Sequence, residues 1–208
     1  MKNYLCSALI LLAMVSCDNK KEAVKTSYKT PDMKLASDVM TPEVLWSFGR
    51  IGSVSVSPDQ KTLLYDVTYF NKEEDRSYSD IYVMNLADGK SQQLTDTDYK
   101  EFGETWTSDG KIAFMSSKSG SVQLWEMNAD GSGLTQLPNV EGGIGGFIFS
   151  PDKSKLLFLK DVKLEQDVHD LHPDLPKANA RLIDGQVYRH WNDWVEAYTH
   201  PFVADYIP

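Results

Sequence analysis

The chain has 208 residues, of which 41% are hydrophobic and 25% are charged, and its formal net charge is −9. These values are ordinary for a globular protein of one domain or two small ones. The excess of acid argues against a nucleic-acid partner, because phosphate binding needs concentrated lysine and arginine.

Residues 1–16 have the pattern of a secretory signal peptide. Lys2 supplies a positive start, and the apolar run that follows is too short to span a membrane as a stable helix. Ser16 and Cys17 end the run, and a small residue before a cysteine resembles the bacterial lipoprotein signal. We therefore expect export to the bacterial cell envelope, with Cys17 lipidated and the lipid as the membrane contact. The alternative is an ordinary signal peptide with a chance cysteine.

The mature chain would carry no thiol for a disulfide, because Cys6 lies inside the signal and Cys17 would be lipidated. Residues 17–37 are polar and lysine-rich, which indicates a flexible tether between lipid and domain. The folded domain is therefore expected over residues 38–208, held together by its core alone.

The domain begins with a helix signal and continues with strands. Thr41 is a hydroxyl N-cap, Pro42 takes the first helical position and Glu43 adds an acid, which predicts a short helix to Phe48. Strands are then expected at 54–56, 61–67, 81–85, 92–95, 112–115, 124–128, 135–137, 147–149, 155–159, 181–188 and 200–206. Charged or irregular loops are expected at 71–79 and 161–179, and a tight crossing is expected at the glycine-rich residues 141–146.

Similar turns recur at a regular spacing along these strands. Gly89 and Gly131 lie 42 residues apart, and Asp109 and Asp152 lie 43 apart. The turns share serine with aspartate or aspartate with glycine: Ser57-Pro58-Asp59, Asp88-Gly89, Ser108-Asp109-Gly110, Asp130-Gly131 and Ser150-Pro151-Asp152. A period in the low forties predicts β-propeller blades. The expected fold is therefore all-β: a partial β-propeller of antiparallel four-stranded blades, preceded by a short helix.

The end of the sequence bears on how complete this propeller is. At about 42 residues per blade, residues 41–208 would form roughly four blades at most. We expect two of them to be complete, with the chain stopping at Pro208 inside a blade. Unfinished blades expose strand edges, so we expect this sequence to be the front part of a longer protein.

Several segments resemble the prolyl oligopeptidase family of serine peptidases, in particular its dipeptidyl-peptidase V and acylaminoacyl-peptidase-like members. These segments are Thr41-Pro42-Glu43, Ser57-Pro58-Asp59-Gln60-Lys61, residues 92–97, 112–116 and 123–128, Tyr188-Arg189-His190-Trp191 and His200-Pro201-Phe202-Val203. The resemblance implies an N-terminal propeller that caps a C-terminal α/β-hydrolase domain carrying Ser, Asp and His. That hydrolase domain is absent from this sequence.

No catalytic residue is expected in this chain. A hydrolase of this type needs Gly-x-Ser-x-Gly, and Gly131-Ser132-Gly133 is instead predicted to be a hairpin turn. Residues 141–146 lack the Lys-Ser or Lys-Thr ending of a phosphate loop. His169 and His172 lie among acids, but Pro173 favours a solvated loop over a metal site. We therefore expect no cofactor, no metal and no activity from this chain alone.

Glu101 is the candidate substrate-binding residue. It follows the first predicted blade, at a position that would face a central cavity. In dipeptidyl peptidases that this chain resembles, propeller carboxylates pair with the free ammonium group of the substrate, and Glu101 is the matching hypothesis. The alternative is a solvated loop charge, which the neighbouring Lys100 favours. Trp191 and Trp194 could line a ligand face, but packing within a blade is the better interpretation.

Two functions follow from these observations. The first is the propeller part of an exported serine exopeptidase that releases short peptides or acyl-amino acids from the N-termini of peptides. In that enzyme the propeller would gate and orient the substrate. The second is a free-standing propeller-like lipoprotein that binds or scaffolds in the periplasm.

Overall fold

The computed structural model describes residues 28–29, 33–35, 37–183 and 194–206. The predicted signal peptide, Cys17, most of the tether, the segment 184–188 of one predicted strand and Trp191 lie outside the described residues. Within the described part, no helix is long and apolar enough to cross a membrane.

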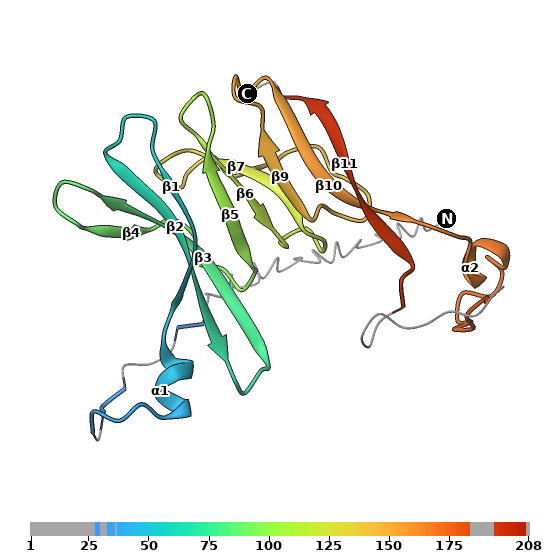
Figure 1. Ribbon diagram of the computed structural model, residues 1–208, viewed down its shortest axis with the longest axis horizontal. Helices are drawn as coiled ribbons and strands as arrows, with labels where there is room; N and C mark the ends of the chain where they lie inside the picture. The colour runs from blue at the N-terminus through green and yellow to red at the C-terminus, as the bar shows by residue number, and fades with distance from the viewer. Residues whose placement is uncertain (1–27, 30–32, 36, 184–193, 207–208) are drawn as a thin grey trace, which may run out of the picture.

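Three antiparallel sheets stand side by side and form successive propeller blades (Figure 1). The first two have four strands in chain order, and the third has three described strands in the order β11-β10-β9. Blade 1 contains β1 (Arg50–Val56), β2 (Thr62–Asn71), β3 (Arg76–Asn85) and β4 (Ser91–Gln93). Blade 2 contains β5 (Glu101–Trp106), β6 (Ile112–Ser116), β7 (Gln123–Met127) and β8 (Thr135–Gln136), and blade 3 contains β9 (Gly146–Phe149), β10 (Lys155–Lys163) and β11 (Ala197–Asp205). The predicted all-β propeller architecture is confirmed.

The predicted helix is α1 (Pro42–Ser47). The Thr41 hydroxyl accepts a hydrogen bond from the Val44 N–H at 3.4 Å, and Pro42 occupies the first helical position, where no donor is needed. Trp46 of this helix meets Phe70 edge to face at a ring separation of 5.4 Å, and the Arg50 guanidinium lies 4.4 Å from the Phe70 ring. These contacts attach the helix to blade 1.

The turn between the first two strands of each blade is built in the same way. A hydroxyl that closes the first strand donates to an aspartate two residues later, and the residue after that aspartate takes a positive φ. The three hydroxyl–carboxylate distances are 2.6 Å for Ser57–Asp59, 2.5 Å for Thr107–Asp109 and 2.5 Å for Ser150–Asp152. The second turn therefore starts from the Thr107 hydroxyl and not from Ser108, the serine that the sequence repeat indicates.

Two predicted loops are partly wrong. Asn71 ends β2 and Arg76 begins β3, so residues 76–79 belong to a long hairpin and not to a charged loop. The Thr68 and Ser79 hydroxyls, 2.6 Å apart, pair the two strands in that region. In the predicted irregular segment 161–179, β10 runs to Lys163 and a short helix follows, α2 (Val168–Leu171).

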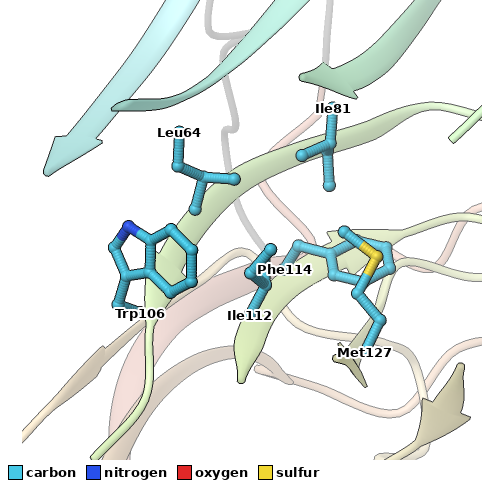
Figure 2. Close-up of a cluster of buried hydrophobic side chains, with 6 residues drawn as sticks. All are labelled: Leu64, Ile81, Trp106, Ile112, Phe114 and Met127. Atoms are coloured by element: carbon cyan, nitrogen blue, oxygen red, sulfur yellow. The ribbon is translucent and has the colours of Figure 1, made fainter. Parts of the chain in front are cut away.

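Apolar side chains join the blades face to face. Between blades 1 and 2, one cluster contains Leu64, Ile81, Trp106, Ile112, Phe114 and Met127 (Figure 2). Between blades 2 and 3, the buried members are Ala113, Met115, Leu124 and Ile144. Successive residues of a strand point to opposite faces of its sheet, so blade 2 contributes alternate residues to the two clusters. Blade 2 is therefore packed on both faces.

The repeated turn gives a paired stability prediction. Gly110 has φ +81° with open space around it, so Gly110→Ala should lower the free energy of unfolding by about 1 kcal/mol through backbone strain alone. Gln60 holds the equivalent place in blade 1 at φ +60°, so Gln60→Gly should raise stability by roughly 0.5–1 kcal/mol. Urea unfolding of the two variants tests this, and shifts of the same sign would contradict it.

Candidate functional site

The structure places the predicted site residue Glu101 at the start of β5, where its side chain is only 1% exposed. It is therefore not a solvated loop charge. A β-bulge at Gly103, where φ is +66° and the β5–β6 register shifts, brings Glu101 and Glu104 to the same side of β5. Both carboxyl groups consequently face blade 1.

Glu101 belongs to a hydrogen-bonded group at the junction of the two blades. Its Oε1 accepts a bond from the Thr97 hydroxyl at 3.1 Å, while Oε2 finds no hydrogen-bond partner among the described residues. Asp80 lies beside it and accepts from the Thr97 N–H at 3.3 Å and from the Thr95 hydroxyl at 3.4 Å. Burial raises the pKa of the Glu101 carboxyl and the Asp80 charge raises it further, while the hydrogen bond from Thr97 lowers it.

Glu104 forms a second pair with Asp66 of β2. The Ser53 hydroxyl joins them, at 2.9 Å from Asp66 Oδ1 and 3.3 Å from Glu104 Oε2, and the Ser53 N–H also donates to Asp66 Oδ1 at 2.8 Å. Glu104 is 3% exposed and Asp66 is 4% exposed. Burial is the main cause that raises the pKa of Glu104, to about 8, and the nearby charge of Asp66 adds to it.

We call these four side chains, Asp66, Asp80, Glu101 and Glu104, the acidic seam. All four are buried, whereas no lysine or arginine is buried among the residues that the structure describes. Buried charges without partners are costly, so such a set holds protons or accepts a cation. A peptide ammonium group is one cation that a carboxylate of this kind can bind.

The sequence pattern identifies one member of the acidic seam and misses three. Glu101 stands out by its place between two repeats, but Asp66 and Asp80 lie inside strands, and Glu104 falls in a stretch where no strand was predicted. An acid within an otherwise β-favouring run such as 63–67 is a signal that could have found Asp66, because strand interiors are poor in aspartate. The packing of blade 1 against blade 2 decides which acidic side chains come together in the acidic seam.

The other candidate positions are explained by local structure. Asp167 caps α2, and its carboxylate also pairs with Lys163 at 2.7 Å, so that the Lys163 bond lowers the pKa of Asp167 to about 2. The predicted solvated loop is thus a helical turn, and among the described residues no set of three or more His, Cys, Asp or Glu side chains is placed to hold a metal. Ser132 bonds Asp130 in the hairpin turn, as expected.

The remaining two predictions concern packing and a chain crossing. Trp194 lies 4.8 Å below the Arg181 guanidinium, which is a packing contact. The glycine-rich residues 141–146 link β8 to β9. Gly142 and Gly143 both have positive φ, and a side chain at Gly143 would meet the Val122 carbonyl at 2.9 Å. The tight inter-blade crossing is therefore confirmed.

Fold and comparisons agree on the class of protein. The structure defines a segment of a β-propeller with four-stranded blades. An acylaminoacyl peptidase from Pyrococcus horikoshii shares this fold with a TM-score of 0.56 at 18% identity, over 77% of this chain and 24% of that one. None of the protein-family models searched matches the chain.

Sequence identity to curated relatives shows the family of the chain. Dipeptidyl-peptidase 5 of Porphyromonas gingivalis is 44% identical over 167 residues, which is 80% of this chain and 24% of that protein. Dipeptidyl-peptidase 5 of Porphyromonas endodontalis is 34% identical over 198 residues, 94% of this chain and 29% of that protein. The chain belongs to the prolyl oligopeptidase family as a propeller segment, and it spans 24% and 29% of the length of these two relatives.

The contact between Gly52 and Asp66 gives a second prediction. A Cβ at Gly52 would lie 2.5 Å from Asp66 Oδ1, and Asp66 cannot withdraw without losing its two bonds to Ser53. Gly52→Ala should therefore cost about 2 kcal/mol of unfolding free energy. Gly145→Ala, beside the first strand of blade 3, is the control, because a Cβ there meets nothing closer than 3.9 Å. Equal urea midpoints for the two variants would contradict the prediction.

Proposed function

We propose that this chain is the propeller part of an exported serine exopeptidase that releases short peptides or acyl-amino acids from the N-termini of peptides. In this proposal the propeller admits and orients the substrate, and a hydrolase domain outside the present chain cleaves it. The observation that carries the proposal is the 44% identity to a dipeptidyl-peptidase 5 across 80% of the chain. The peptide is the proposed partner.

The acidic seam supplies a chemical reason for substrate orientation. A carboxylate in a desolvated site attracts an ammonium group strongly, and it discriminates against an acylated amine that carries no charge. Glu101 Oε2 is the atom available for this contact, because Oε1 already accepts a bond from Thr97. Since Glu101 is buried, the seam has to open at this end when the substrate binds.

The proposal is tested with the complete protein that contains this chain. A fluorogenic dipeptide amide with a free amine, its N-acetylated form and an acyl-amino acid amide are the three substrates. Hydrolysis of the first or the third, abolished by a serine-reactive phosphonate, supports an exopeptidase. A folded protein that cleaves none of them would overturn the proposal and favour a binding lipoprotein.

In the same enzyme, Glu101→Gln should raise KM for the free-amine dipeptide about tenfold, which corresponds to roughly 1.4 kcal/mol. The amide keeps the shape of the side chain but removes the charge that would pair with the ammonium group. Glu141→Gln, at an exposed glutamate next to blade 3, is the matched control and should leave KM unchanged. A KM that rises equally for the N-acetylated substrate would show a structural effect of Glu101 and not recognition of the amine.

We also propose that the protein is anchored to the cell envelope through Cys17. The support is the apolar run that ends in Ser16-Cys17, followed by a polar segment. Cys17→Ala should abolish incorporation of radiolabelled palmitate and release the protein from the membrane fraction. Cys6→Ala is the control and should leave both readouts unchanged. Labelling that persists in Cys17→Ala would rule out this anchor.

A further inference from the structure

We propose that a proton on the carboxyl group of Glu104, which faces Asp66 across the Ser53 hydroxyl, latches blade 1 to blade 2, so that its loss loosens the seam between them. The inference concerns the joint between two blades and does not depend on the proposed peptidase activity. It assigns the latch to three side chains on three strands: Ser53 on β1, Asp66 on β2 and Glu104 on β5.

The geometry requires a proton at this place. The Ser53 hydroxyl lies 2.9 Å from Asp66 Oδ1 and 3.3 Å from Glu104 Oε2, and its single hydrogen cannot be donated fully to both. With that hydrogen on Asp66, the contact with Glu104 needs a proton on the Glu104 carboxyl group. Asp66 Oδ1 already accepts two bonds from Ser53, while Glu104 Oε1 has no donor within reach among the described residues. A proton on Glu104 turns two repelling groups into a donor and an acceptor.

The described surroundings of the pair supply acids and no neutralising cation. β1 contributes the uncharged Ser53 to the contact, β2 contributes Asp66, and β5 carries Glu104 with Glu101 one bulge away. Asp80 of β3 acts on Glu101, and Lys118 also acts on the acidic seam through Glu101. The charged group of blade 1 that acts on Glu104 is therefore an acid, Asp66.

The position of the Asp66 carboxylate is fixed by the backbone of β1. Asp66 lies directly over Gly52, at the bulge where the β1–β2 register shifts between Ile51 and Val54. A side chain at Gly52 would displace the carboxylate, so the missing Cβ gives Asp66 its room, and the Ser53 N–H holds Oδ1 there at 2.8 Å. When both carboxyl groups are charged, they repel one another in this buried place, and separating β5 from β1 and β2 relieves the repulsion.

The direction of the pH effect follows from Glu104. Its pKa is raised from 4.5 to about 8 in the closed seam, and in an opened seam it returns toward the ordinary value. The proton therefore stabilises the closed seam fully below about pH 4.5. This stabilisation declines as pH rises toward 8 and is gone above it, and in between the open population grows by about tenfold per pH unit.

Hydrogen–deuterium exchange of the complete protein at pH 5.5, 6.5 and 7.5, read by mass spectrometry, tests the latch. After correction for the intrinsic exchange rate, protection of the β1 and β5 amides should fall by about a hundredfold between the first and last pH in the wild type. In Glu104→Gln, which has no proton to lose, protection should stay within about threefold. Amides of β6 and β7 serve as the internal reference.

Three further variants identify which carboxyl group carries the proton. Asp66→Asn removes the charge that faces Glu104 and can donate to an ionised Glu104, so it should make the pH slope shallower, while the part caused by the burial of Glu104 remains. It keeps the test decisive where Glu104→Gln fails to fold. Glu141→Gln should keep the wild-type slope. Glu101→Gln should keep the part of the slope that Glu104 causes, although the pKa of Glu101, the other buried carboxyl group of β5, is also raised by burial. A flat wild-type profile, or a slope that survives in Glu104→Gln and disappears in Glu101→Gln, would overturn the proposal.

Discussion

The packing of blade 1 against blade 2 is the contact on which the rest of this structure depends. Leu64 and Ile81 of one sheet meet Trp106 and Phe114 of the next, and all four are nearly or fully buried (Figure 2). Burying side chains of this size contributes roughly 1.5–3 kcal/mol each. The four carboxyl groups of the acidic seam lie at the same joint and are buried with it. The unusual electrostatics of the acidic seam is a consequence of blade packing.

Features fixed by neighbouring residues could be predicted from the sequence, and features fixed by distant ones could not. The Thr41 cap, the Ser57 and Ser150 turns and the crossing at Gly142–Gly143 are local, and each lies where the pattern indicated. The long β2–β3 hairpin was missed because its charged tip looks like a loop until Thr68 and Ser79 are seen to pair.

The acidic seam shows the same limit for the site. Glu101 could be found because the blade repeat marks its position, but the spacing that puts Glu104 beside it depends on the bulge at Gly103. Asp66 approaches Glu104 from another sheet, and nothing in a single sequence records that contact. Raised pKa values are likewise properties of burial, which the sequence cannot specify residue by residue.

The two seams of blade 2 compensate their buried acids differently. Between blades 2 and 3, Glu126 accepts a hydrogen bond from the Tyr206 hydroxyl and has Lys111 at 3.9 Å, so a donor and a cation are both at hand. The two glycines at β-bulges also lie under different groups. The Asp66 carboxylate covers Gly52, whereas the Met115 methyl group covers Gly103. At the joint between blades 1 and 2, by contrast, the charged group that acts on Glu104 is another acid, Asp66. Sensitivity to pH should therefore be confined to the joint between blades 1 and 2, while the joint between blades 2 and 3 stays closed over the same range.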